Sequence, residues 1–223
     1  MLNVFKTAFY NNSNIGLYGF ATDSYCILAE NIKPEIVEKI KSTLDVPVFQ
    51  LTIFNSSLIG VFCNGNENIL LVPNLIKAHE IKMLEKLNIK HEIIDTKYTA
   101  LGNNLLIKED VCLVNPNMEK EAITQLEKLN FKVELGKIAD MSTVGSCAIL
   151  TKNGCLLHPD STQDDIKQIE KLFKVQADIG TVNMGNPYVK SGIIINSKGY
   201  ILGDQTTGPE TMRLDFALKT LEK

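Results

Sequence analysis

The sequence predicts a single α/β domain in which five ββαβ units close into a ring. Three observations lead to this fold class. A glycine recurs at a nearly constant interval, a strand-to-helix junction recurs at the same interval, and the last unit lacks one strand that the N-terminus can supply. Self-similarity at a fixed interval is typical of repeat architectures, so it governs how each element is interpreted.

The first observation is the glycine that opens each unit, in IGLYGF, IGVFCN, LGNNLL, VGSCAI and SGIIIN. These residues are Gly16, Gly60, Gly102, Gly145 and Gly192, at successive intervals of 44, 42, 43 and 47 residues. Units of about 45 residues therefore account for all 223 residues as one domain. The predicted units are 13–57, 58–99, 100–142, 143–186, and 187–223 completed by 1–12.

The second observation is a junction at which an apolar strand ends and a helix begins. NILLVPN, VCLVNPN and GCLLHPD place Pro73, Pro116 and Pro159 at two intervals of 43 residues. In each unit a strand follows the glycine, then a turn rich in Asn, Asp, Gly and Ser, which suit tight turns. The second strands that come next are apolar on both faces, which indicates burial. They are YCILA, NILLV, VCLVN, GCLLH and GYILG.

A helix follows each second strand, because apolar residues recur there with a period near 3.6 and charged residues fill the other face. Thr162, three residues before Asp165, predicts an N-cap for the fourth helix. The apolar helix positions are Ile36, Val37, Ile40 and Leu44; Ile81, Leu84 and Leu87; Ala122, Ile123, Leu126 and Leu129; Ile166, Ile169 and Phe173. Each helix leads to a third strand, in VPVFQLTI, IKHEIID, FKVELGKI and VQADIGTV.

The third observation concerns the two ends of the chain. The fifth helix, predicted over about 209–221, leaves no residues for a third strand. LNVFKTAF at 2–9 is a spare strand that precedes the first glycine, as the other third strands precede theirs. Pairing of these two ends closes the ring and removes exposed sheet edges, so a doubly wound sheet and a two-domain chain are both disfavoured.

Composition narrows the function classes. The net charge is −3, and a single arginine, Arg213, accompanies the lysines, so direct readout of nucleic acid is disfavoured. Five cysteines without a CxxC pair indicate reduced core thiols and no metal site. No apolar run is long enough to span a bilayer, and the N-terminus does not resemble a signal peptide, so we expect a cytoplasmic protein without membrane contact.

Several motifs together resemble archaeal translation initiation factor 6, a family with the five-bladed α/β propeller called the pentein fold. They are NNSNIGLYGFATDSYCILA, LLVPN, ALGN, VGSCAILTKNG with LLHP, and GTVNMGNPYVKSGIIINSKGYILGDQTTGPE. The resemblance runs from about residue 8 to residue 220. It implies a non-enzymatic factor, without cofactor, that binds the intersubunit face of the large ribosomal subunit. Its chief contact would be a ribosomal protein beside the sarcin–ricin loop, and it would block joining of the small subunit and accompany late large-subunit maturation. We expect a monomer.

The loops that join one unit to the next are rich in Asn, Ser, Tyr and Gly, which suit an adaptable hydrogen-bonding surface. All five must lie on one face of the ring. By the resemblance, Asn103 matches a ribosome-facing position. The predicted ribosome-binding residues are therefore Asn103 first, then Asn11, Asn12, Asn64 and Asn186.

Two alternatives remain open at this stage. Penteins include Cys–His–carboxylate enzymes that act on guanidino substrates, and His158 in LLHPD invites that comparison. The final unit, where those enzymes carry the nucleophile, contains no cysteine, which disfavours this alternative. The other alternative is a small-ligand binder that uses the central channel of the ring.

Overall fold

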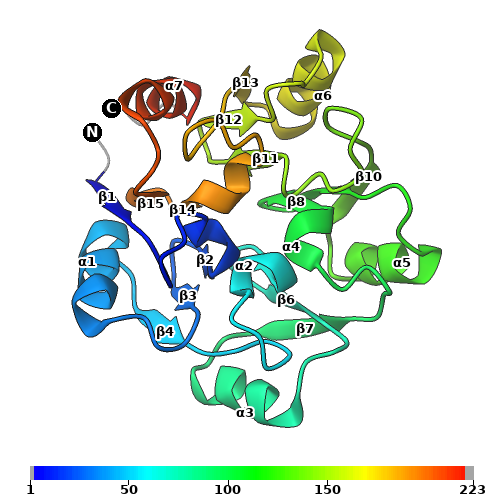
Figure 1. The fold of residues 1–223 in the computed structure, drawn as a ribbon. Coiled ribbons are helices and arrows are strands. Elements are labelled where there is room, and N and C mark those ends of the chain that lie inside the picture. The colour runs from blue at the N-terminus through cyan, green and yellow to red at the C-terminus, as the bar shows by residue number, and fades with distance from the viewer. Residues whose placement is uncertain (1–2, 219–223) are drawn as a thin grey trace.

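The computed structural model describes residues 3–218 and shows an α/β ring of five units. Each unit contributes one three-stranded sheet around a common centre, with its long helix at the outside (Figure 1). No helix among residues 3–218 is long and apolar enough to cross a membrane. The five-unit ring predicted from the repeat is confirmed.

The elements follow the predicted order in every unit. Unit one has a 3-10 turn η1 (Ile15–Leu17), β2 (Gly19–Ala21), β3 (Cys26–Leu28), α1 (Pro34–Leu44) and β4 (Val48–Gln50). Unit two has α2 (Ile59–Phe62), β5 (Asn64–Gly65), β6 (Leu70–Pro73), α3 (Ala78–Lys86) and β7 (His91–Ile94). Unit three has α4 (Leu101–Asn104), β8 (Leu105–Lys108), β9 (Val111–Val114), α5 (Lys120–Lys128) and β10 (Lys132–Leu135). Unit four has β11 (Ala148–Leu150), β12 (Gly154–Leu157), α6 (Gln163–Phe173) and β13 (Gln176–Ile179). Unit five has a 3-10 turn η2 (Val189–Gly192), β14 (Ile193–Ile195), β15 (Gly199–Gly203) and α7 (Gly208–Leu218), and β1 (Asn3–Thr7) completes its sheet.

The sheets share one topology. The second strand of each unit is central, antiparallel to the first strand and parallel to the third, as in β2–β3–β4. A parallel pair needs a crossover, and the long helix of each unit supplies it. β1 pairs with β15 in the same parallel sense, from Asn3 opposite Gly199 to Thr7 opposite Gly203. The N-terminal strand therefore closes the ring, as predicted; the predicted ends of this strand and of the last helix extend to residues outside those described.

The core lies between each sheet and its helix. Four second strands are buried along their whole length, and β9 is buried except at Val111, as the apolar runs predict. The inward helix positions are buried too, for example Ile40, Leu84, Leu126 and Phe173. Thr162 and Asp165 form the predicted capping box at the start of α6. All five cysteines are buried free thiols that belong to this core.

The repeat-opening glycine does not lie at the edge of the first strand, as the sequence suggested, but inside a short helical turn before it. Gly16 lies in η1, Gly60 in α2 and Gly102 in α4, each one residue after a buried Ile or Leu. In unit five the same place, directly after buried Val189, belongs to Lys190. The prediction that Gly192 is the fifth member of the series is therefore wrong: Gly192 is the last residue of η2.

Candidate functional site

The loops that join consecutive units form one face of the ring, and four of them contain the same tight turn. Two residues bridge across each turn, and the residues between them include two at positive φ. Asn, Asp and Gly tolerate this conformation, whereas a bulky side chain there is uncommon. The bridging pairs are Phe9 with Asn12, Ile53 with Ser56, Ile138 with Met141, and Val182 with Asn186. The turn backbones are therefore held in one shape by something other than residue preference.

Carboxylates from the next unit's helix supply part of that constraint. Glu80, near the start of α3, accepts hydrogen bonds from the backbone N–H groups of Phe54 and Asn55, both at 2.8 Å. Glu210 of α7 likewise accepts from the backbone N–H groups of Met184 at 3.2 Å and Gly185 at 2.8 Å. Glu119 contacts Lys97 and Asp165 contacts Ala139 in the same way. Four interunit loops are thus fixed by a carboxylate of the unit that follows.

Glu210 and Glu80 have a lowered pKa in these positions. Burial acts to raise the pKa of Glu210, but hydrogen bonds from the Thr207 and Gly185 N–H groups and from the Thr181 and Thr207 hydroxyls outweigh it and lower the pKa to about 2. The pKa of Glu80 is also lowered, because N–H donors and the Thr52 hydroxyl outweigh its burial. Negatively charged carboxylates therefore lie beneath the turns of the loop face, where N–H and hydroxyl groups of the protein donate hydrogen bonds to them.

The loop of unit one is fixed differently. In this loop the side-chain oxygen of Asn14, Oδ1, accepts three hydrogen bonds. The donors are Asn186 Nδ2 at 2.8 Å, Ser191 Oγ at 3.1 Å and Asn183 Nδ2 at 3.2 Å. Asn183 Nδ2 also donates to the carbonyl of Ser13 at 2.8 Å. This amide network joins the loops of units five and one, where the ends of the chain meet. It makes the first and last units a continuous part of the loop face.

The short helical turns surround a narrow channel at the centre of the ring. A Cβ built on Gly60 would lie 1.9 Å from the carbonyl oxygen of Gly16, and one on Gly102 would lie 2.0 Å from that of Gly60. A Cβ on Gly16 would lie 2.0 Å from the carbonyl oxygen of Lys190. Neighbouring units thus approach through bare backbone, and Lys190 contributes its carbonyl in the same position as the glycines do.

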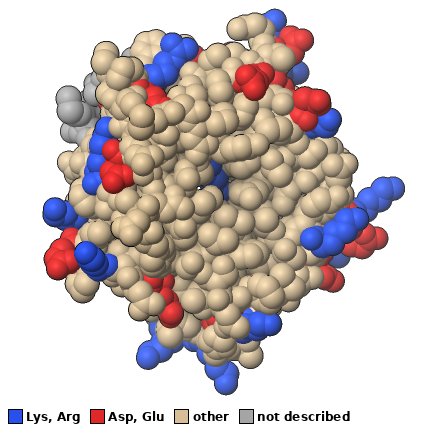
Figure 2. Space-filling model, in the orientation of Figure 1, with Lys and Arg blue, Asp and Glu red and all other residues tan. Residues whose placement is uncertain are grey.

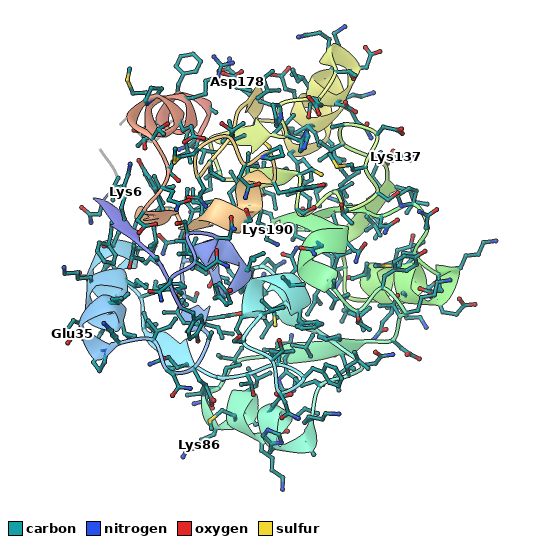
Figure 3. All side chains as sticks on the ribbon, in the orientation of Figure 1. Lys6, Glu35, Lys86, Lys137, Asp178 and Lys190 are labelled. Atoms are coloured by element: carbon teal, nitrogen blue, oxygen red, sulfur yellow. The ribbon has the colours of Figure 1, made fainter. Side chains whose placement is uncertain are left out.

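The Lys190 side chain crosses the channel at this level. Figure 3 shows it at the centre of the ring, and its Nζ donates to the carbonyl oxygen of Gly102 at 2.6 Å. Burial lowers the pKa of Lys190 to about 8, while the neighbouring Cys63 thiol acts in the opposite direction. A cation therefore stands at the axis of a ring whose other members at this level are glycines.

A cavity of about 440 Å³ opens from the loop face down to Lys190. In Figure 2 the visible face is almost free of charged side chains, which gather at its rim, and a central hollow shows a basic residue at its base. Apart from Lys190 the cavity lining is uncharged, with amides and hydroxyls from several units. These polar residues are Asn14, Asn103, Thr143, Ser146, Asn186, Tyr188 and Ser191.

The structure brings two of the predicted site residues to this cavity. Asn103 lies in α4 at its edge, and its side-chain amide makes no hydrogen bond within the described residues. Asn186 lines it too, but its amide is engaged with Asn14 and Ser191. The free amide of Asn103 is the group best placed to accept and donate hydrogen bonds to a partner.

The other three predicted residues have different places. Asn11 is exposed at the tip of the first loop, in the left-handed conformation with φ of 60°. Asn12 is engaged internally, since its Nδ2 donates to the hydroxyl of Tyr18 at 3.1 Å. Asn64 is buried in β5, donates to the carbonyl of Leu105 at 2.7 Å, and lines a cavity on the opposite side of the ring. The structure does not bring Asn64 together with the others.

The environment of the cysteines bears on the enzymatic alternative. Burial raises the pKa of Cys63, Cys155 and the remaining thiols, so none has the low pKa of a nucleophilic cysteine. Burial lowers the pKa of His158, whose ring packs edge-on against Tyr188 with centroids 5.6 Å apart. His158 Nδ1 accepts from the N–H of Asp160 at 3.2 Å. This histidine stabilises its own strand end and is not paired with a thiolate.

Sequence reasoning missed Lys190 and the anchoring carboxylates. Lys190 was hidden because Gly192 offered a plausible fifth glycine two residues later. The buried apolar residue before the glycine, repeated as Ile15, Ile59, Leu101 and Val144, would have identified Val189 and then Lys190. Among residues 3–218 no group of three or more His, Cys, Asp and Glu is arranged to hold a metal ion.

Three proteins named translation initiation factor 6 are similar to this chain over nearly its full length. Translation initiation factor 6 of Saccharolobus solfataricus is 39% identical, over 97% of this chain and 99% of that protein. The Sulfolobus acidocaldarius factor of the same name is 35% identical, over 95% and 97%. The Pyrococcus horikoshii factor is 34% identical, over 97% and 99%.

Among solved structures, DDAH from Pseudomonas aeruginosa has a TM-score of 0.51 at 11% identity, covering 80% of this chain and 72% of that one. The N-terminal domain of ArgZ also has a TM-score of 0.51, at 8% identity, covering 75% and 67%. Both are pentein enzymes, and likeness at such low identity shows the shared fold alone. The family model of the eIF-6 family matches residues 4–217, so the chain belongs to the eIF-6 family.

Proposed function

We propose that this protein binds the large ribosomal subunit at its intersubunit face and prevents association with the small subunit by occupying that face. The loop face is the proposed contact surface. The observation that carries the proposal is the uncharged, amide-rich centre of that face, with the free Asn103 side chain at the edge of its cavity, in a member of the eIF-6 family.

The construction of the face supports a steric role. Carboxylates beneath the turns and the network around Asn14 hold the loops in place before any partner arrives. A preorganised surface loses little conformational entropy on binding. Acidic and basic residues at the rim suit a chief contact with a ribosomal protein, because rim charges assist encounter more than they add affinity. We infer that direct contact with ribosomal RNA is minor.

The remaining features of the proposal follow from the same surface. We propose that Asn103 and Asn11 contact the ribosome directly, and that Asn186, Asn12 and Asn64 contribute by holding loops and strands in place. The factor would act as a cytoplasmic monomer, catalyse no reaction and accompany late maturation of the large subunit. Its buried, high-pKa thiols support a non-enzymatic role.

Asn103→Arg tests this proposal. The variant should bind salt-washed archaeal large subunits at least about 10-fold more weakly, because a bulky cation would lie in the centre of an uncharged contact. Its melting temperature should stay within about 2 °C, since the half-buried Asn103 side chain makes no hydrogen bond within the described residues that the substitution would break. Co-sedimentation with large subunits and inhibition of subunit joining are the measurements.

Asn68→Arg is the matched control, with the same change of residue and charge at an exposed position of the β5–β6 turn. Asn68 lines the cavity on the opposite side of the ring, so this variant should sediment like the wild type. If both variants lose binding equally, the contact is not specific to the loop face. If the wild type does not travel with the large subunit, the proposed function is wrong.

A further inference from the structure

A second cavity, of about 800 Å³, opens at the other end of the channel. Its outer rim consists of the hairpin turns between first and second strands, and its wall consists of the first strands themselves. The wall carries apolar side chains that are only half-buried and so remain in contact with the cavity. They are Phe20, Ala21, Ile107, Ile149, Leu150 and Ile195, from β2, β8, β11 and β14.

Several charged groups at the rim of this cavity have partners of their own. Lys152 Nζ lies 3.1 Å from Asp23 Oδ2. Glu67 accepts hydrogen bonds from the backbone N–H of Asp23 at 2.8 Å and from the hydroxyl of Ser24 at 3.0 Å. Lys108 donates to the carbonyl of Phe173. With Lys90, Glu109 and Asp110 these residues give the rim charges of both signs, whereas Lys190 lies at the inner end.

Lys190 is the single residue that lines both cavities, so its side chain separates them at the axis. Its ammonium group has three N–H bonds, and within the described residues the carbonyl of Gly102 is its one hydrogen-bond acceptor. A partly desolvated cation with spare donors costs free energy unless an anion or water satisfies it. The cation at the inner end and the apolar wall together are suited to bind an anion that also carries an apolar group.

We propose that the hairpin-side cavity binds a small organic monocarboxylate with an apolar body. The carboxylate accepts hydrogen bonds from Lys190 Nζ at the inner end, and the apolar body packs against the first-strand side chains such as Ile149. The cavity size and its mostly apolar wall with one convergent charge are typical of small-molecule sites. A single carboxylate matches the one ammonium group, that of Lys190, at the inner end of the cavity.

This site is distinct from the proposed ribosome contact. The two lie at opposite ends of the channel, and the wall residues of the large cavity, Lys190 aside, do not line the loop-face cavity. Binding of a carboxylate can therefore be present or absent whatever the protein does on the ribosome. The proposal is tested without ribosomes.

Decanoate is the probe, and isothermal titration calorimetry of the intact protein is the measurement. Wild-type protein should bind one decanoate per chain, and decan-1-ol, which lacks the charge, should bind at least about 10-fold more weakly. Lys190→Met should weaken decanoate binding by at least about 10-fold, since it removes the cation and keeps most of the apolar stem. Lys152→Met is the matched control, because that lysine pairs with Asp23 at the rim, and it should bind like the wild type.

Ile149→Trp is the second variant, which fills the apolar part of the cavity and leaves the charge in place; it too should weaken decanoate binding. Circular dichroism establishes that each variant is folded before it is titrated. Binding in the wild type that persists unchanged in Lys190→Met overturns the proposal, because the carboxylate then lies elsewhere. Failure of the wild type to bind decanoate at about 1 mM also overturns it.

Discussion

Lys190 is the residue at which the fivefold repetition is broken. Four units place a glycine in the short turn at the centre of the ring, and the fifth places a lysine there. Its carbonyl still contacts Gly16 as the other members of the series contact their neighbours, so the backbone of the repeat is kept. The side chain adds a cation to the channel without altering the path of the chain. A single residue thus adds a charged group to a backbone that is otherwise repeated in all five units.

Lys190→Met should make the protein more stable at neutral pH. The pKa of Lys190 is about 8, lowered by burial from about 10.5, so below pH 8 the folded state holds a partly desolvated charge. As pH rises from 8 towards 10.5 the folded state releases this proton before the unfolded state does, and the wild type gains stability relative to the variant. We expect an advantage of about 1 kcal/mol for the variant at pH 7, reduced from the full shift because water reaches the channel.

Urea unfolding of both proteins at pH 7, 9 and 10.5 measures this difference. The advantage of Lys190→Met should decline across the series and vanish by about pH 10.5. Lys152→Met serves as the reference, because it makes the same change of residue at the rim, where the ammonium group pairs with Asp23. A difference that grows with pH would contradict the assigned direction of the pKa shift.

At the scale of elements, the short central turns and the N-termini of the long helices have different structural roles. The turns bring neighbouring units to backbone contact, and the helix N-termini direct carboxylates to the loops. Each unit has its long helix between the second and third strands of its sheet, but each loop has its own tip residues. The elements therefore provide a common frame, and the loops provide the differences between units.

Gly60→Ala should destabilise the ring. The added Cβ would lie 1.9 Å from the Gly16 carbonyl oxygen and 2.7 Å from that of Gly19, and backbone atoms cannot turn aside as a flexible side chain can. Overpacking against backbone should cost about 2 kcal/mol or more. Gly208→Ala is the control, since a Cβ there has no neighbour within 4 Å, and its effect should be within about 0.5 kcal/mol. Equal effects in chemical denaturation would show that the contact between turns carries no strain.

Glu210→Gln should destabilise the loop of unit five at neutral pH. The carboxylate accepts from Thr207, Gly185 and Thr181, and its folded pKa is about 2 against an ordinary value of 4.5. Its contribution to stability is present above pH 4.5 and is lost as pH falls through 2. We expect the variant to lose about 1–2 kcal/mol at pH 7, allowing for the partial exposure of the group.

The pH dependence distinguishes charge from packing. Between pH 4.5 and 2 the stability of wild type and Glu210→Gln should converge, as followed by thermal unfolding. Glu127→Gln is the control, at an exposed helix position whose carboxylate accepts no hydrogen bond among the described residues, and it should be as stable as the wild type at pH 7. If the difference in stability between wild type and Glu210→Gln stays constant down to pH 2, the loss of stability comes from altered hydrogen-bond geometry and not from the lost charge. Weaker ribosome binding by Glu210→Gln alone would support the role of the fixed loop face.

At the scale of the whole molecule, closure of the ring depends on the N-terminal strand. β1 occupies the edge of the fifth sheet, where Asp204 donates its backbone N–H to the carbonyl of Thr7 at 3.0 Å. Lys6 Nζ donates to the carbonyl of Thr206 at 2.6 Å. Without β1 the fifth sheet would lose its third strand, and the buried strand β15 would become an edge strand, unlike the central strands of the other four sheets.

Deletion of residues 1–7 should therefore lower stability by more than about 3 kcal/mol and promote self-association through the open edge. Deletion of residues 1–2 alone, which leaves Asn3–Thr7 in place, is the control and should behave like the wild type. Thermal unfolding and size-exclusion chromatography are the measurements. A monomeric, equally stable protein after the longer deletion would show that closure is not required.

The sequence by itself determined the number of units, the order of elements within each and the closure by the N-terminus. These properties depend on local preference and on periodicity, which a single sequence displays at every repeat. The apolar positions predicted for the first and fourth helices all lie within α1 and α6 for this reason. The resemblance of its motifs to the translation initiation factor 6 family was also readable, and the family match confirms it.

Only the tertiary structure decided which residues meet at the centre of the ring. Lys190 contacts Gly102, 88 residues away, and Asn183 contacts Ser13, 170 residues away, and no local pattern encodes such distances in sequence. The amides of Asn64 and Asn103 look alike in the sequence, but one is saturated inside a sheet and the other is free at the cavity edge. Hydrogen-bond satisfaction depends on neighbours brought together by the closed ring, and that is a property of the fold rather than of any segment.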